Sequence, residues 1–132
     1  MLDIESPKDM AKLIKKTKCV IVKFSANWCG PCQNYQFKHN YEDLKENCEK
    51  YSDFIKFVEL DVDEDNEIVN STKYYDFKIK SIPHIKFCFD GDIIKEYNGI
   101  NCLDDILKNI NKVIELVLTE RAEQSGQSTQ SG

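Results

Sequence analysis

Apolar and polar residues follow two different periods along the first part of the chain. Behind the pair Ser6-Pro7, apolar residues recur at helical spacing over residues 10–14, so we predict a helix that begins at Pro7 with Ser6 as its cap. Residues 19–24 are then apolar at every position except Lys23. A run this short and this apolar is typical of a strand buried on both faces, and we predict a central strand here.

The same switch of period repeats further along the chain. Helical spacing of apolar residues after residue 32 predicts a second helix, with a stripe made of Phe37, Tyr41, Leu44 and Cys48. Residues 55–62 predict a second buried strand, which Glu59 interrupts. A polar helix is predicted over residues 66–75.

The second half of the chain predicts antiparallel strands. Two alternating runs, residues 82–89 and 92–97, flank Asp90-Gly91, which is a strong signal for a hairpin turn. Residues 101–120 predict the last helix, with Asn101 as its cap. Because helices and strands alternate first and a hairpin follows, we predict an α/β fold with a mixed central sheet and helices on both of its faces.

The length of 132 residues suits one hydrophobic core, which we assign to a single domain over residues 1–120. From residue 121 to residue 132 the only apolar side chain is Ala122, so we predict a disordered tail there. On the last helix, the apolar stripe begun by Ile106 and Ile110 continues through Val113, Ile114, Val117 and Leu118. We expect other residues of the same domain to cover this extension.

Composition and charge narrow the classes of function. The chain is 41% hydrophobic and 31% charged, with a net charge of −5 and no dense basic cluster, so we expect no nucleic-acid partner. Its longest apolar runs are strand-sized, so we expect no membrane span. The first residues show no basic segment followed by an apolar one, so we expect no cleaved signal peptide.

Six cysteines occur, and four of them lie within apolar runs or helical patterns: Cys19, Cys48, Cys88 and Cys102. These four are typical of buried free thiols rather than of a disulfide scaffold, which favours a reducing, cytoplasmic compartment. The other two belong to Cys29-Gly-Pro-Cys32, between a predicted strand and a predicted helix. Free backbone N–H groups at such a helix start stabilise a thiolate.

Two residues inside the motif shape its turn, and the order of the cysteines sets their roles. Pro31 has a fixed φ that suits a first helical turn, and Gly30 tolerates tight geometry. The first cysteine of such a turn is expected to be exposed and the second to point inward, so Cys29 is predicted to attack and Cys32 to resolve.

The segment Phe24-Ser-Ala-Asn-Trp-Cys-Gly-Pro-Cys32 resembles the active-site segment of thioredoxins, especially the cytosolic eukaryotic ones. Ile82-Pro83 is similar to the cis-proline loop of that family, Phe89-Asp-Gly91 to its hairpin turn, and Asn98-Gly99 to its groove glycine region. The resemblance covers roughly residues 1–110 and implies the thioredoxin fold with a cis bond between Ile82 and Pro83.

The resemblance also implies an activity, which is reduction of protein disulfides by thiol–disulfide exchange. A shallow groove formed by Trp28, Ile82, Pro83 and Gly99 would receive disulfide-containing target proteins. No cofactor is expected on this chain, because electrons would come from NADPH through a thioredoxin reductase. A monomer is expected.

Two charged residues depart from the family pattern. Lys23 stands where the family has a buried aspartate, and Glu59 stands where bacterial-type members often carry a lysine. We predict that the two form an exchanged ion pair, because an unpaired buried charge is costly. The pair either tunes the pKa of the active-site thiols or is purely structural. Two further departures are Phe37, near the place of a kinking proline, and His84, in place of a threonine.

Other interpretations of the cysteine pair stay open. Zinc needs four ligands, whereas the chain has no second C-x-x-C and only His39 and His84 as histidines. An oxidase or isomerase of this fold usually carries a histidine inside the motif, where this chain has Pro31. A non-catalytic thioredoxin-fold binding module, or an accessory subunit of a larger assembly, would need neither cysteine. Reduction of insulin separates the enzyme from the binding module.

Overall fold

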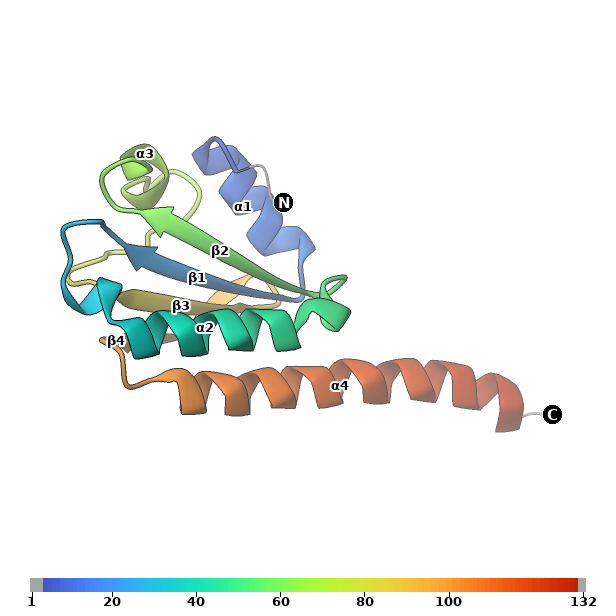
Figure 1. Ribbon diagram of the computed structural model, residues 1–132. Coiled ribbons are helices and arrows are strands. Elements are labelled where there is room, and N and C mark those ends of the chain that lie inside the picture. Colours follow the sequence, from blue (N-terminus) through green and yellow to red (C-terminus); the bar gives the residue numbers. More distant parts are fainter. Residues whose placement is uncertain (1–3, 131–132) are drawn as a thin grey trace.

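A four-stranded sheet with the strand order β2-β1-β3-β4 organises the fold. The computed structural model describes residues 4–130. One face of the sheet carries α1 (Pro7–Lys16) and α3 (Asn66–Val69), and the other carries α2 (Tyr35–Asn47) and α4 (Leu103–Gln130) (Figure 1). The predicted α/β class, with a mixed sheet between helices, is confirmed.

The central strand β1 (Cys19–Ser25) pairs parallel with β2 (Ile55–Asp61) and antiparallel with β3 (His84–Phe89). A parallel pair needs a long crossover, and the segment that contains α2 supplies it. β3 forms the predicted hairpin with β4 (Asp92–Asn98). The turn residues Asp90 and Gly91 have φ values of 50° and 86°, which two-residue hairpins require.

Alternation along β1 separates two cores. Cys19 and Ile21 belong to the core under α2 and α4, whereas Val20, Val22 and Phe24 belong to the core under α1 and α3. Lys23 follows the same alternation and therefore lies on the α2 side of the sheet. Because β1 has a strand on each side and helices over both faces, residues 19–24 are all buried.

Two helix starts can be compared with the predictions. α1 begins at Pro7, and the Asp9 N–H donates to Ser6 Oγ at 3.1 Å, as predicted. α4 begins at Leu103, so the cap position is Cys102 rather than the predicted Asn101. The carbonyl of Cys102 accepts the first helical bond, from the N–H of Ile106 at 3.1 Å.

The predicted polar helix over residues 66–75 is wrong beyond Val69, where α3 ends. Residues 70–83 contain neither helix nor strand. Asn70, Ser71 and Thr72 follow the helix directly, and their short polar side chains compete for backbone hydrogen bonds. The segment is tied back to α3 by Tyr75, whose hydroxyl donates to the Ile68 carbonyl at 2.6 Å.

The last helix is longer than predicted, because α4 continues to Gln130 instead of ending near residue 120. The prediction of a disordered tail from residue 121 is therefore corrected for residues 121–130, while residues 131 and 132 lie outside the described residues. Each residue added to an existing helix forms one more backbone bond, and six of the ten residues 121–130 are good helix formers: Arg121, Ala122, Glu123 and three glutamines. Within the described residues, no helix has both the length and the apolar character needed to cross a bilayer.

The extended part of α4 packs on its own domain, as expected. Val113 and Val117 are buried in the core under α2 and α4. Arg121 donates to Asp53 Oδ2 at 2.6 Å and lies 5.1 Å from the ring centroid of Phe54. Leu118 differs from the expectation, since it is 44% exposed. The domain thus covers Val113 and Val117 but not Leu118, although all three belong to the apolar stripe of the helix.

Candidate active site

The two motif cysteines lie in the loop between β1 and α2 and form a disulfide, with their Cα atoms 5.2 Å apart. Cys32 belongs to a short 3-10 turn, Pro31–Gln33, and its N–H donates to Cys29 Sγ at 3.2 Å. α2 itself starts only at Tyr35, after Asn34 has capped it. The prediction of one helix starting directly after the motif is corrected here: the N–H that stabilises the first sulfur comes from the 3-10 turn.

Exposure does not distinguish the two cysteines, because each is only 4% exposed. The prediction of an exposed first cysteine and a buried second one is therefore wrong for the disulfide form. The bonded sulfurs shield each other, and Ala26, Val62 and Ile82 pack around them. The two cysteines differ in what they face: Cys29 lines a surface groove, and Cys32 is not among its lining residues.

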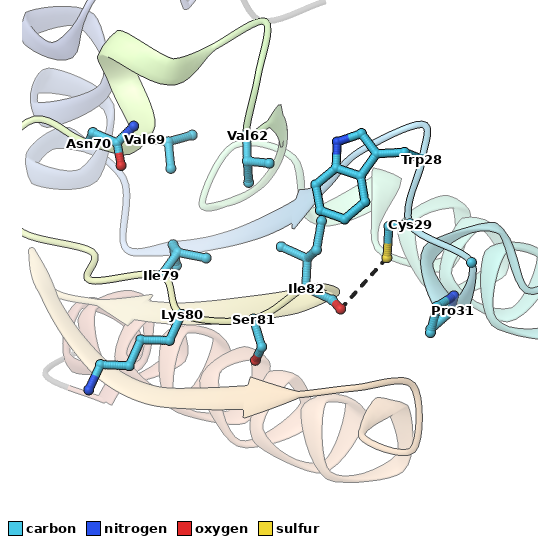
Figure 2. A pocket seen from close by; sticks show the side chains of 11 residues that line it. Trp28, Cys29, Pro31, Val62, Val69, Asn70, Ile79, Lys80, Ser81 and Ile82 are labelled. Carbon is cyan, nitrogen blue, oxygen red and sulfur yellow. Dashed lines mark hydrogen bonds between the residues drawn. The ribbon is translucent and has the colours of Figure 1, made fainter.

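The groove has a volume of about 450 Å³ and runs away from Cys29 across the loops at one end of the sheet (Figure 2). Trp28 forms one wall and is 70% exposed. Its indole Nε1–H donates to Asp63 Oδ2 at 2.6 Å, which fixes the ring although solvent surrounds it. Opposite the motif, the carbonyl oxygen of Ile82 lies 3.6 Å from Cys29 Sγ.

The residues predicted for the groove divide into two groups. Trp28 and Ile82 line it, together with Gly30 and Pro31 of the motif. Pro83 and Gly99 lie behind it: Pro83 is buried, and the N–H of Gly99 donates to its carbonyl at 2.9 Å. The peptide bond between Ile82 and Pro83 is cis, as the resemblance implied. The φ of 81° at Gly99 favours glycine there.

Gly30 has a different role from the predicted one. Its φ of −57° and ψ of −55° are ordinary helical values. A Cβ built on it would meet nothing within 4 Å. The turn therefore does not need the conformational freedom of glycine at this position.

Sequence reasoning missed more than half of the groove lining. The missed residues come from the loop after β2, from the end of α3 and from the segment between α3 and β3: Val62, Val69, Asn70, Ile79, Lys80 and Ser81. In Figure 2 Val62, Val69 and Ile79 extend the apolar floor away from Cys29, and Lys80 points out of it. These loops show no regular period, so only the tertiary structure reveals that they meet Trp28.

The predicted ion pair is present, with Lys23 Nζ 2.9 Å from Glu59 Oε1. Lys23 Nζ also lies 4.3 Å from the ring centroid of Tyr41, and a second ammonium, that of Lys45, lies 2.6 Å from Glu59 Oε2. Burial raises the pKa of Glu59, but hydrogen bonds from Lys45 and Lys23 outweigh this effect and hold the pKa below its ordinary value. These contacts support a structural role, and the tuning role stays a prediction.

The remaining four cysteines are free and buried, as predicted. Burial raises the pKa to about 12 for Cys19 and Cys88 and to about 11 for Cys102. Thiols with such values stay protonated near neutral pH and are poor nucleophiles. Within residues 4–130, no group of three or more His, Cys, Asp or Glu side chains is arranged to hold a metal ion.

Comparison with known proteins agrees with this geometry. The model of the Thioredoxin family matches residues 4–112. Thioredoxin of Mus musculus is 36% identical over 84 residues, which are 64% of this chain and 70% of that protein. Thioredoxin of Mycoplasmoides gallisepticum is 32% identical over 111 residues, which are 82% of this chain and 100% of that protein.

A solved structure gives the same result at the level of the fold. The X-ray structure of Fasciola hepatica thioredoxin superposes with a TM-score of 0.64 at 26% identity, over 81% of this chain and 93% of that one. The chain therefore belongs to the thioredoxin family and is a thiol–disulfide oxidoreductase, a disulfide reductase whose redox pair is Cys29 and Cys32.

Proposed function

We propose that the two cysteines divide the reduction of a target disulfide between them. The Cys29 thiolate attacks one target sulfur, forms a mixed disulfide and releases the first target thiolate. Cys32 then attacks the Cys29 sulfur, so the second target thiolate leaves and both target thiolates take up protons. Two electrons pass to the target, and the Cys29–Cys32 disulfide remains. One observation carries this assignment: Cys29 lines the groove, and Cys32 is not among its lining residues.

Two groups beside Cys29 support its role as nucleophile. The N–H of Cys32 points at Cys29 Sγ and stabilises negative charge on it. The Ile82 carbonyl, 3.6 Å away, can accept the S–H of the neutral thiol. Backbone groups that the fold holds in place can thus form a hydrogen bond with Cys29 both as a thiolate and as a neutral thiol.

The target binds in the groove in this proposal. Trp28 and Ile82 contact its apolar side chains, and the backbone beside Pro83 pairs with an extended target segment as an added strand. Gly99 supports this segment from behind through its bond to the Pro83 carbonyl. Pro31 and Gly30 leave the approach to Cys29 open.

The proposal also covers the electron donor, the cellular compartment and the oligomeric state. We infer a thioredoxin reductase as the partner that returns the pair to the dithiol, with NADPH bound to that partner. The four buried free thiols favour a reducing compartment, and we propose the cytoplasm. We propose a monomer as the working form.

Trapping experiments test the division of roles. In Cys32→Ser the mixed disulfide cannot be resolved, so a covalent adduct with insulin should accumulate on a non-reducing gel. Cys29→Ser is the matched control, because it keeps the other thiol and should form no adduct. In the reduced wild type, iodoacetamide near neutral pH should label Cys29 before Cys32.

Two results would contradict the proposal. Faster labelling of Cys32, or an adduct in Cys29→Ser, would reverse the assignment. Failure of the wild type to reduce insulin with dithiothreitol would favour a binding module over an enzyme.

A further inference from the structure

Asn98, the last residue of β4, connects the two ends of the segment Ser81–His84. Its side-chain oxygen Oδ1 accepts a hydrogen bond from Ser81 Oγ at 3.1 Å and another from His84 Nδ1 at 2.7 Å. The next residue, Gly99, donates its N–H to the Pro83 carbonyl at 2.9 Å. Three hydrogen bonds from the end of one strand thus hold three of the four residues in this segment.

The fourth residue of the segment is Ile82, which makes the contact with the active site. Its carbonyl lies 3.6 Å from Cys29 Sγ, and its side chain packs against Cys29 and Cys32. Ile82 belongs to the groove, whereas Asn98 is not among the lining residues of the groove. Asn98 can therefore influence the target only through the residues on either side of Ile82.

The contact with Asn98 Oδ1 is the hydrogen bond that the buried His84 ring forms. The ring is 3% exposed, and Nε2 has no hydrogen-bond partner among the described residues. Burial lowers the pKa of His84, so the neutral ring carries one proton, which the bond to Asn98 places on Nδ1. The ring orientation is set by this bond and by packing against Phe24, whose centroid is 6.0 Å away.

We propose that Asn98, acting through Ser81 and His84, is a positioning residue that holds the backbone around Ile82 in the orientation in which an extended target segment pairs with it beside Cys29. The inference rests on the proposed function, since it assumes that the target binds along this segment. A small disulfide that only meets Cys29 does not use this pairing. Asn98 should therefore matter for peptide targets and not for small disulfides.

Two substrates with the same chromophore test the proposal in single turnovers of the pre-reduced protein. One is a short, uncharged peptide with a single cysteine in mixed disulfide with thionitrobenzoate, and the other is dithiobis(nitrobenzoate). In Asn98→Leu, the half-saturating peptide concentration should rise about tenfold, the scale expected when one hydrogen bond's worth of binding free energy is lost. At a pH at which Cys29 is the thiolate and does not donate to the Ile82 carbonyl, the limiting rate and the rate with the small disulfide should not change.

Three further variants separate positioning from mere stability. Ser81→Ala removes one of the two side-chain hydrogen bonds, at an exposed position where water can replace it, and should raise the half-saturating peptide concentration about threefold. Asn98→Asp keeps the acceptor oxygen and should restore the wild-type value. Glu96→Gln is the matched control, because it disturbs the ion pair between buried Lys86 and exposed Glu96 on the same two strands without contacting the segment. It should behave as wild type.

The outcomes distinguish the inference from the function on which it rests. Two outcomes would overturn the inference alone. One is an equal loss of rate with the peptide and with the small disulfide in Asn98→Leu. The other is a half-saturating peptide concentration that stays at the wild-type value in both Asn98→Leu and Ser81→Ala. A wild type that reduces neither substrate would overturn the proposed function and the inference with it.

Discussion

Replacing either partner of the Lys23–Glu59 ion pair perturbs the protein in a different way. The Lys23 side chain is 9% exposed, and its counter-ion Glu59 lies 2.9 Å away. The Glu59 side chain is 40% exposed and has a second ammonium, that of Lys45, at 2.6 Å. Lys23 therefore depends on Glu59 for neutralisation more than Glu59 depends on Lys23.

The magnitudes follow from this asymmetry. In Glu59→Gln the Lys23 ammonium stays buried without its counter-ion, which costs about 3–5 kcal/mol in a fully buried pair. Because solvent reaches Glu59, screening reduces the expected loss to about 1–2 kcal/mol. Lys23→Met keeps the volume, removes the desolvated charge and leaves Glu59 paired with Lys45. We expect the free energy of unfolding of this variant to change by less than about 1 kcal/mol.

The effect of Glu59→Gln depends on pH. The pKa of Glu59 in the folded protein lies below its ordinary value of 4.5, which represents the unfolded chain. A carboxylate with a lowered pKa stabilises the fold above the unfolded value, and this stability is lost as the pH falls through the folded value. The difference between wild type and Glu59→Gln should therefore be full near neutral pH and shrink below a pH of about 4.5.

Urea unfolding followed by circular dichroism measures both expectations, with all proteins in the same redox state. A loss in Lys23→Met equal to or larger than the loss in Glu59→Gln would refute the reasoning, as would a difference that does not shrink in acid. The same variants test the tuning role. If the resolving step shows one pH profile in all three proteins, the pair has no part in the chemistry.

Three other predictions concern the site and the last helix. Gly30→Ala should stabilise the protein by about 0.5–1 kcal/mol, because φ is helical and the site is open, and a lower melting temperature would contradict this. Val117→Ala should cost about 1.6 kcal/mol for two buried methyl groups, whereas Leu118→Ala, at an exposed site, should cost much less; equal losses in urea unfolding would show that the helix extension is not packed. Asp63→Ala should free the Trp28 ring and weaken peptide binding severalfold with little change in stability, and Asp63→Asn, which keeps an acceptor, should bind as wild type.

The sequence by itself determined the elements whose signals are local. The apolar run of β1, the Ser6-Pro7 helix start and the Asp90-Gly91 turn each depend on residues within a few positions of one another, and all three are present. The C-x-x-C spacing likewise determined that Cys29 and Cys32 can bond. Lys23 and Glu59 were predictable as partners because each interrupts an apolar strand and the two strands pair in parallel.

Predictions failed where local sequence gives no strong preference between conformations. The end of α3 at Val69 and the continuation of α4 to Gln130 are such cases, because polar residues are compatible with both helix and loop. The prediction that Cys29 is exposed was also wrong. The exposure of Cys29 depends on how Ala26, Val62 and Ile82 close over the bonded sulfurs.

Only the tertiary structure decided how the groove is assembled and how it is held. Trp28 binds Asp63, 35 positions away, and Cys29 meets the Ile82 carbonyl, 53 positions away. Ser81 and His84 meet on one oxygen of Asn98 because the hairpin register places His84 opposite it. A contact between distant segments depends on strand order and register, which are properties of the whole packed sheet, so no periodicity along the chain records it.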